Sequence, residues 1–318
     1  MRALVFDGVG AAIRTVPEPS TTTEALIRVR MAGICATDRE ILKGYGQFRG
    51  VLGHEFVGVV EESPDPGWIG RRVVGEINCP CHACAVCQRG DGIHCPHRQV
   101  LGIHGRDGAM AEYCLLPLSN LHQVPVTVTD QQAVFVEPLA AALAILERHP
   151  PRPSQTIAVI GDGKLGLLVI QVMRLTGARC LLVGRHPEKW QRMTHCGEIP
   201  FILEDQWPEG QQVDMVVECS GSPSGLDLAL RWVRPRGRIV MKSTLRSQHT
   251  LNLTAIALHE ISVEGSRCGP FPPALKVLER GLVQVDPLID AIFPLHQASE
   301  ALQRALRPGS LKVILSTT

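Results

Sequence analysis

The sequence predicts a two-domain α/β protein, in which a mostly β domain is followed by a doubly wound parallel sheet. The chain has 318 residues, and domains average about 150 residues, so roughly two domains are expected. Residues 1–149 hold short β-type runs punctuated by Gly, Pro and Asn, whereas apolar strand-like runs alternate with helical stretches from residue 155 onward. This alternation is typical of βαβ units, and a cluster of prolines at positions 150, 151 and 153 marks the boundary.

The elements of the first domain, residues 1–149, are short and mostly extended. Strands are expected at residues 25–29, 57–61 and 72–74, where β-forming residues dominate. Residues 139–149 form a continuous run rich in Ala and Leu, which predicts a buried helix that the prolines end.

The second domain, residues 150–270, is expected to contain a helix at residues 165–176 and strands at residues 156–160, 179–183, 213–217, 238–241 and 261–263. The remaining segment, residues 271–318, has helix-like stretches at 273–280 and 297–306 and a strand-like run at 311–315. Because this tail lacks the glycine-loop signature of the second domain, we expect it to return to the first.

The composition excludes several classes of protein. With 45% hydrophobic and 20% charged residues, the chain is not disordered. Its 32 Lys and Arg balance 31 Asp and Glu, so no general attraction to nucleic acid or an anionic membrane is expected. The longest apolar run, residues 139–146, is too short to span a bilayer, and no signal-length apolar stretch opens the chain. We expect a soluble, cytoplasmic protein.

Four closely spaced cysteines indicate a structural zinc site. They form a C-x2-C-x2-C-x7-C array in a lobe at residues 79–97: Cys81, Cys84, Cys87 and Cys95. Four thiolates complete the tetrahedral coordination of zinc, so a structural ion is favoured over a catalytic one. The total of 11 cysteines is odd, which argues against a disulfide framework. Free thiols are the alternative interpretation.

A glycine-rich loop indicates a nucleotide site. It follows the strand expected at residues 156–160 and opens a helical stretch: Gly161, Asp162, Gly163, Lys164, Leu165 and Gly166. In this context the glycines permit a tight turn, close approach of backbone N–H groups to a pyrophosphate, and close packing of helix on sheet. The alternative is a plain glycine turn.

The end of the second parallel strand favours NADP(H) over NAD(H). An NAD site places a carboxylate there for the adenosine ribose, but this chain has Gly184 followed by Arg185. The guanidinium of Arg185 can pair with the 2′-phosphate of NADP, and Lys189 would add a second cation from the following helix. The alternative is that Arg185 is a solvated surface residue and the site takes NAD without an acid.

Three separated motifs in the first domain hold candidate ligands for a catalytic zinc. They are GICATD with Cys35, GHE with His54 and Glu55, and VEPL with Glu137. A thiolate, an imidazole and a carboxylate can supply three ligands and leave one position open. Each residue also fits a buried cysteine, a core histidine or a surface acid, so spacing alone leaves both interpretations open.

The order of these motifs resembles the zinc-dependent medium-chain dehydrogenase/reductase superfamily, in particular its sorbitol, threonine and glucose dehydrogenase branch. The motifs are GICATD, GHE, the four-cysteine array, GAMAEY at residues 108–113, EPLA and GDGKLG. The resemblance implies a GroES-like β fold for the first domain, completed by the tail, and a Rossmann fold for the second. It also implies an active site in the cleft between them.

The resemblance assigns roles to several residues. It makes Cys35 and His54 ligands of the catalytic zinc, with either Glu55 or Glu137 binding directly and the other acting through water. The resemblance further implies that Asp38 orients the histidine and that Thr37 relays the substrate proton. Candidate neighbours of the nicotinamide, at the carboxyl ends of strands or by resemblance, are Cys219, Ser220, Ser243, Thr244 and Arg267.

The chain departs from the family pattern at three places. Glu40 stands where many members have a histidine that ends the proton relay, which leaves the route of the proton open. The segment between Cys35 and His54 is short, and its candidate pocket residues are Tyr45, Phe48 and Arg49, of which Arg49 is expected to face solvent. Arg71 replaces the usual Asp of a Gly-Asp-Arg-Val motif.

The expected function is reversible oxidation of a secondary alcohol, polyol or sugar, with hydride passing to or from NADP(H). Two zinc ions per chain are expected, one catalytic and one structural, and the family implies a homodimer or homotetramer. One alternative is an NADPH-binding or sensory protein of the same fold without turnover. A zinc-ribbon nucleic-acid binder is the other, although the balanced charge argues against it.

Overall fold

The computed structural model describes residues 1–193, 199–244 and 250–317. The chain divides into two compact units, which we call the first unit and the second unit. The first unit comprises Met1–Glu137, Phe271–Arg280 and Ile289–Thr318, and the second comprises Pro138–Pro270 and Gly281–Leu288. Each unit has its own sheet and its own buried core.

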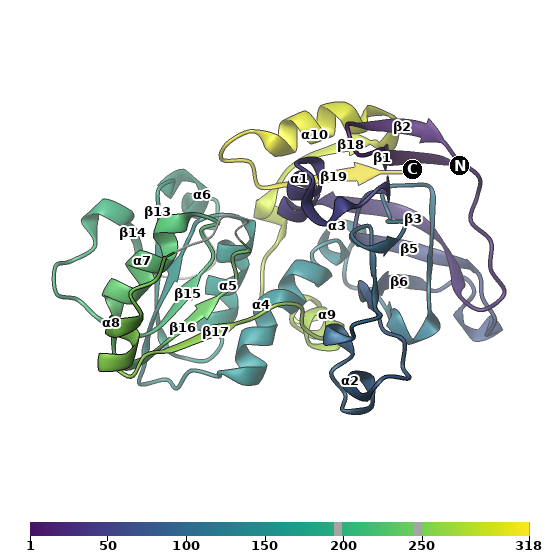
Figure 1. Ribbon diagram of the computed structural model, residues 1–318. Coiled ribbons are helices and arrows are strands. Elements are labelled where there is room, and N and C mark those ends of the chain that lie inside the picture. The colour runs from purple at the N-terminus through teal and green to yellow at the C-terminus, as the bar shows by residue number, and fades with distance from the viewer. Residues whose placement is uncertain (194–198, 245–249, 318) are drawn as a thin grey trace. The chain divides into compact units, whose positions relative to one another are not determined.

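The largest sheet of the first unit joins strands from both ends of the chain. Among the described residues its strand order is β11-β6-β5-β3-β19-β18, with β10 paired to β3. The bounds are β3 Ala25–Ile34, β5 Glu55–Glu62, β6 Arg72–Gly75, β10 Tyr113–Leu116, β11 Leu121–Gln123, β18 Ile289–Pro294 and β19 Lys312–Ser316. Since β19 pairs antiparallel with β3, residues near the C-terminus lie beside the motif that begins at Gly33 (Figure 1).

The other elements of the first unit are short. One small sheet has the order β2-β1-β4, from Ala11–Thr15, Arg2–Phe6 and Gly50–Val51, and another has the order β7-β8-β9, from Asn78–Cys79, Gln99–Leu101 and Gly105–Arg106. The helices are α1 Ala36–Leu42, α2 Ala85–Gln88, α3 Asp130–Ala133, α9 Phe271–Glu279 and α10 Ala298–Leu306. The predicted mostly β architecture of the first domain is confirmed.

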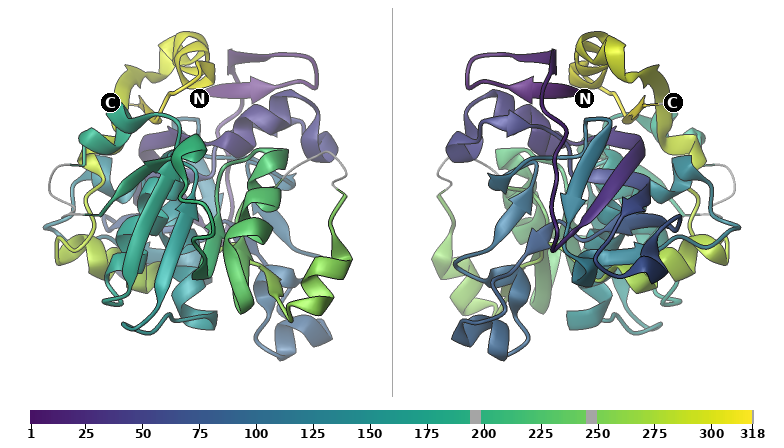
Figure 2. Two further views of the ribbon diagram at one scale, coloured as in Figure 1. Left: turned by 90° about the vertical axis from the view of Figure 1, so that its left-hand side faces the viewer. Right: turned by 90° about the vertical axis from the view of Figure 1, so that its right-hand side faces the viewer.

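The second unit contains a parallel sheet with the order β14-β13-β12-β15-β16-β17 among the described residues. Its teal and green strands lie side by side in the left view of Figure 2. Its strands are β12 Thr156–Ile160, β13 Arg179–Gly184, β14 Phe201–Leu203, β15 Val213–Glu218, β16 Val233–Met241 and β17 Ser262–Gly265. Its helices are α5 Lys164–Arg174, α6 Pro187–Gln191, α7 Pro223–Trp232 and α8 Leu253–Leu258. Two halves run outward from β12 and β15, which is the strand order of a Rossmann fold and confirms that prediction.

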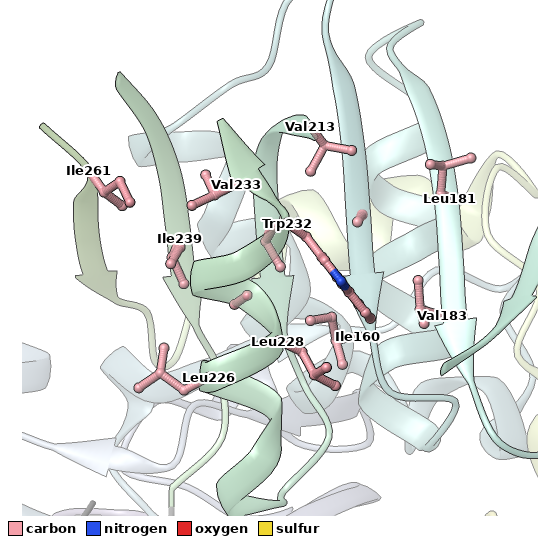
Figure 3. Packing of buried hydrophobic residues seen from close by; sticks show 13 residues of the cluster. Ile160, Leu181, Val183, Val213, Leu226, Leu228, Trp232, Val233, Ile239 and Ile261 are labelled. Atoms are coloured by element: carbon pink, nitrogen blue, oxygen red, sulfur yellow. The ribbon is translucent and has the colours of Figure 1, made fainter. Parts of the chain in front are cut away.

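The core of the second unit forms where α7 covers the sheet. Trp232, at the end of α7, is 6% exposed and lies among Ile160, Val183 and Leu228 (Figure 3). Its indole also stacks on Trp207, with ring centroids 4.3 Å apart. Burial of one such aromatic side chain contributes about 3 kcal/mol or more, so this packing fixes α7 against the strands that carry the glycine loop.

The unit boundary lies earlier than residue 149, where the sequence analysis places it. Helix α4, Val136–Arg148, begins in the first unit and continues in the second. The carbonyl of Ala141 accepts a hydrogen bond from Lys242 Nζ at 2.7 Å, and a Cβ at Gly269 would lie 2.1 Å from the Ala140 carbonyl oxygen. These close contacts attach α4 to the parallel-sheet unit. The proline cluster at positions 150, 151 and 153 marks the end of α4 and not the boundary between the units.

The strands are close to their expected positions, but several run longer. β12 covers the predicted residues 156–160, whereas β3 continues to Ile34, five residues beyond the expected end at 29. The extension follows from pairing with β5 and β19, which local propensity does not reveal. Within the described residues, no helix is both long enough and apolar enough to cross a membrane.

Candidate catalytic and cofactor sites

A thiol, an imidazole and a carboxylate converge in the first unit. Cys35 lies between β3 and α1, while His54 and Glu55 stand at the start of β5. Potential ligand atoms of the three residues all lie within 4.8 Å of one another. The pairing register of the two strands explains the convergence. Gly33 of β3, two residues before Cys35, is paired with Glu55 of β5. We call these three residues the S/N/O group.

Asp38 holds two members of the S/N/O group in place. Its Oδ2 accepts a hydrogen bond from the backbone N–H of Cys35 at 2.7 Å, and its Oδ1 lies 3.5 Å from Nδ1 of His54. Burial of the imidazole opposes its charged form, but the Asp38 carboxylate outweighs this effect and raises the pKa of His54 well above its usual value. The same negative charge favours a metal cation on the other ring nitrogen.

Lys312 lies beside the S/N/O group, although no motif in the sequence indicates it. Its Nζ forms an ion pair with Glu55 Oε2, and both residues are only 1% exposed. Burial of the ammonium opposes its charge, but the carboxylate of Glu55 raises the pKa of Lys312. The available signal was a single lysine in the apolar run Leu-Lys-Val-Ile-Leu at residues 311–315. Buried lysines are rare unless they are paired.

The S/N/O group fits a zinc ion. Its donor set is one that zinc binds, and Glu55 Oε1 is buried without a hydrogen-bond partner among the described residues. Glu137, the other predicted carboxylate, begins α4 and is not part of the convergent group. It contributes instead to the negative surroundings that raise the pKa of Lys312.

The predicted proton-relay residues lie on α1. Thr37 Oγ1 is 3.8 Å from the sulfur of Cys35, next to the S/N/O group. Glu40 lies one turn further along, where its carboxylate is 3.0 Å from Lys43 Nζ and 3.5 Å from Arg39 Nε. The charge of Glu40 is therefore balanced by surface cations.

The four cysteines of the lobe also converge. The S···S distances are 3.9 Å for Cys81–Cys87, 3.5 Å for Cys84–Cys87, 3.8 Å for Cys84–Cys95 and 3.5 Å for Cys95–Cys81. A tetrahedral zinc with bonds of about 2.3 Å requires sulfurs about 3.8 Å apart, whereas a disulfide needs about 2.05 Å. The arrangement therefore fits a closed zinc site.

The thiols of this lobe differ in how readily they ionise. Backbone N–H groups of Ala83 and Cys84 lower the pKa of Cys81 to about 6, whereas desolvation and neighbouring thiols raise the pKa of Cys87 to about 12. Cys81 therefore ionises readily at neutral pH, whereas a cation at the centre would favour the thiolate of Cys87.

The glycine loop has the geometry of a pyrophosphate site. Gly161 has φ +112°, and a Cβ at Gly166 would lie 1.9 Å from the Gly161 carbonyl oxygen, so both positions exclude a side chain. Gly163 faces open space, since a Cβ at this position would meet no atom of the described residues within 4 Å. It directly precedes α5, which begins at Lys164 and Leu165, and the N-terminus of a helix favours an anion.

The two predicted phosphate-binding cations differ in their surroundings. The Arg185 side chain is 59% exposed and forms an ion pair with Glu204, with Nε 2.7 Å from Oε2. Lys189 is buried, and its Nζ lies 3.1 Å from Asp162 Oδ1. The role of Lys189 as a second phosphate-binding cation stays a prediction, and in this structure the charge of Lys189 is paired with Asp162 within the unit.

The predicted nicotinamide neighbours lie on loops at the carboxyl ends of β15, β16 and β17: Cys219, Ser220, Ser243, Thr244 and Arg267. Ser243 Oγ accepts the N–H of Gly221 at 2.8 Å, which links the first two loops. The buried Lys242 donates to the Arg267 carbonyl at 2.7 Å and so fixes the third. This edge is where a Rossmann sheet binds its ligand.

The remaining departures from the family pattern have local explanations. Arg71 donates to the Gly67 carbonyl and to Gln123 Oε1, and its guanidinium lies 5.5 Å from the ring centroid of Trp68. These contacts indicate a structural role in the turn before β6. In the short segment before His54, Phe48 is buried, whereas Tyr45 and Arg49 are exposed.

Both units match known protein families. The alcohol dehydrogenase GroES-like domain matches residues 21–126, and the zinc-binding dehydrogenase domain matches residues 165–280. The erythritol/L-threitol dehydrogenase of Mycolicibacterium smegmatis is 31% identical over 312 residues, which cover 88% of this chain and 86% of that protein.

Solved structures agree with this assignment. A zinc-binding dehydrogenase from Sinorhizobium meliloti 1021, bound to NADP, has a TM-score of 0.91 and 28% identity, with 99% of this chain and 98% of that chain covered. The alcohol dehydrogenase rspB from Escherichia coli CFT073, complexed with NADH, has a TM-score of 0.90 and 27% identity, with 99% of each chain covered. The chain therefore belongs to the zinc-dependent medium-chain dehydrogenase/reductase family and is a zinc oxidoreductase that acts on alcohols.

Proposed function

We propose that the chain oxidises a secondary alcohol or polyol reversibly with NADP(H), using a catalytic zinc held by the S/N/O group. The observation that carries this proposal is the convergence of Cys35, His54 and Glu55 beside a buried acid and a proton-relay hydroxyl. The similarity to an erythritol/L-threitol dehydrogenase supports a polyol substrate.

Each residue near the S/N/O group has a defined task. Zinc, when bound, supplies a Lewis acid that polarises the substrate oxygen and favours its deprotonation. Cys35 and His54 hold the ion, and Glu55 is the carboxylate placed to complete the set, with Glu137 as the alternative. Asp38 fixes the orientation of both protein ligands.

Proton and hydride leave the substrate by different routes. Thr37, beside Cys35, accepts the hydroxyl proton and passes it outward, and Glu40 on the same helix is the candidate terminus. The hydride goes to the nicotinamide of the cofactor, for which the loops after β15, β16 and β17 are the candidate neighbours.

The cofactor choice rests on Gly184 and Arg185. No carboxylate side chain is attached at the end of β13, and the exposed Arg185 is suited to a 2′-phosphate. Because Arg185 is already paired with Glu204, the phosphate must compete with that carboxylate. We therefore expect a preference for NADP(H) that is moderate in size.

The four-cysteine lobe is proposed to bind a second, structural zinc. The family resemblance further suggests a cytoplasmic homodimer or homotetramer without nucleic-acid or membrane partners. A zinc count on the purified protein tests the first point. We expect two ions per chain, with Cys84→Ser losing one ion and stability, and Cys35→Ser losing the other ion and activity.

The decisive experiment is a screen of alcohols, polyols and sugars with both cofactors. Turnover of secondary alcohols or polyols that disappears in Cys35→Ser and in His54→Ala is expected. A protein that binds two zinc ions and NADPH but oxidises or reduces none of the substrates would favour the sensory alternative over the enzyme.

A further inference from the structure

One carboxylate at the end of β13 comes from a different part of the chain. Asp162, the second residue of the glycine loop, is 7% exposed. Its Oδ2 accepts the backbone N–H groups of Arg185 and His186 at 2.6 and 2.7 Å. These are the first two residues after β13. Asp162 therefore joins the glycine loop to the turn at which the adenosine ribose is expected.

Gly184 makes room for this carboxylate. A Cβ at Gly184 would lie 2.5 Å from Oδ2 and 2.7 Å from Cβ of Asp162. The two positions therefore exclude each other, since one volume holds either the Asp162 side chain or a side chain on residue 184. The acid that is absent from the strand end is replaced in space by an acid from the glycine loop.

Asp162 also controls the charge of this region. Lys189 Nζ lies 3.1 Å from Oδ1, and His186 Nδ1 lies 3.2 and 3.1 Å from the two carboxylate oxygens. Although partial burial opposes ionisation, hydrogen bonds from Arg185 and the charge of Lys189 hold the pKa of Asp162 below its usual value. At neutral pH the carboxylate is charged and cancels the lysine charge.

The hydrogen-bond capacity of Asp162 is already used. A carboxylate has about four acceptor positions, and three donors contact this one: two backbone N–H groups and Lys189 Nζ. His186 Nδ1 lies beside them, within 3.2 Å of both carboxylate oxygens and of Lys189 Nζ. Little capacity remains for ribose hydroxyls. The side chain is therefore placed to act through its neighbours and not as a direct ribose ligand.

We propose that Asp162 is a positioning residue that sets the discrimination between NADP(H) and NAD(H), by fixing the Arg185–His186 turn and cancelling the charge of Lys189. The inference rests on the proposed nicotinamide cofactor at this loop. Without the Asp162 charge, the field of Lys189 would add to that of Arg185 and strengthen the attraction for a 2′-phosphate. The wild-type chain therefore prefers NADP(H) over NAD(H) less strongly than Arg185 and Lys189 would if Asp162 carried no charge.

The test measures nucleotide binding, which needs neither turnover nor the catalytic zinc. Dissociation constants for NADP+ and NAD+ are determined by calorimetry on the wild type, Asp162→Asn, Lys189→Met and the double variant. Asp162→Asn keeps an oxygen for the backbone N–H groups and should shift the ratio of affinities toward NADP+ by about tenfold, through tighter binding of NADP+ with NAD+ binding within about twofold of wild type. Lys189→Met leaves the carboxylate uncompensated and should shift the ratio toward NAD+ by a similar factor.

The double variant and a control identify the cause. Asp162→Asn with Lys189→Met removes both charges, so its ratio should return to within about threefold of wild type. Asp205→Asn, at an exposed position in the turn after β14 and next to Glu204, removes a charge outside this network and should leave the ratio within about twofold.

Several results would overturn the inference. Equal weakening of both nucleotides by Asp162→Asn would show a purely structural role, and loss of NAD+ binding alone would show a direct ribose ligand. If Asp162→Asn does not fold, an unchanged ratio in Lys189→Met would still contradict the proposed charge balance. A wild-type protein that binds neither nucleotide would overturn the cofactor proposal as well, whereas binding of both with an insensitive ratio would overturn only this inference.

Discussion

The four-cysteine lobe and the S/N/O group differ in how their members are spaced along the chain. The lobe draws its four sulfurs from residues 81–95 and places them 3.5–3.9 Å apart through short turns. The S/N/O group draws on β3, β5 and the loops beside them, with Lys312 of β19 behind it. One site depends on local turns and the other on sheet register.

This difference has an energetic consequence. A closed thiolate site stabilises the segment that wraps around it, whereas an open site keeps a position for substrate and contributes chemistry. Substitutions in the two groups should therefore separate stability from activity.

The largest effect is expected at the S/N/O group. Cys35→Ser removes the thiolate ligand, so the Lewis acid is lost and kcat/KM should fall by about 10³-fold or more. The melting temperature should change by only a few degrees. Cys84→Ser is the matched variant in the lobe and should instead lower the melting temperature by about 10 °C. The separation of roles is contradicted if Cys35→Ser retains turnover.

Lys312→Met tests whether the buried ion pair supports the S/N/O group. The substitution leaves Glu55 as a buried, uncompensated charge, and breaking such a pair costs about 3 kcal/mol. Denaturant unfolding of the metal-free protein measures this loss. Adding Glu55→Gln to the variant should recover much of it, because the unpaired charge is then absent. No recovery in the double variant would assign the cost to lost packing against Phe135, whose ring centroid lies 5.5 Å from Nζ.

Thr37→Ala tests the proton relay next to Cys35. Loss of a positioned proton-transfer group slows alcohol oxidation by about 10²-fold. Thr37→Ser retains a hydroxyl and should be nearly as active as the wild type, which makes it the matched control. Steady-state kinetics at saturating cofactor measures both variants. Equal losses in the two variants would show that the methyl group and its packing matter, and not the hydroxyl.

The difference between the four-cysteine lobe and the S/N/O group also explains which sites can be predicted from the sequence. The four-cysteine site and the glycine loop depend on spacing within a few residues, so the residues alone indicate both. For the S/N/O group, spacing left a metal site and a core histidine equally open, and only resemblance to a family distinguished them. Lys312 was missed because its partner, Glu55, lies 257 positions away in the sequence.

The same limit applies in the second unit. The sequence correctly places an arginine after β13, but it does not show that Asp162, from the preceding loop, neutralises Lys189. Helical spacing predicts that Lys189 lies on the same side as Arg185. In the structure Lys189 is buried and paired with Asp162, whereas Arg185 is exposed. The position of the unit boundary in α4 likewise depends on contacts with Lys242 and Gly269 that local pattern does not contain.

The smallest effect is expected for Arg185→Ala, because this residue is an exposed cation in a region where charges are already paired. Its guanidinium must leave Glu204 to bind a 2′-phosphate, and solvent screens the exposed pair, so the net gain is modest. We expect kcat/KM for NADP+ to fall by about tenfold while the value for NAD+ stays within about twofold. Glu204→Gln removes the competitor and should change the NADP+ value in the opposite direction.

Gly184→Asp is unsuitable for this purpose, since a Cβ there would lie 2.5 Å from Asp162 Oδ2. A wild-type enzyme with a higher kcat/KM for NAD+ than for NADP+ would reduce Arg185 to a surface charge and contradict the proposed cofactor preference.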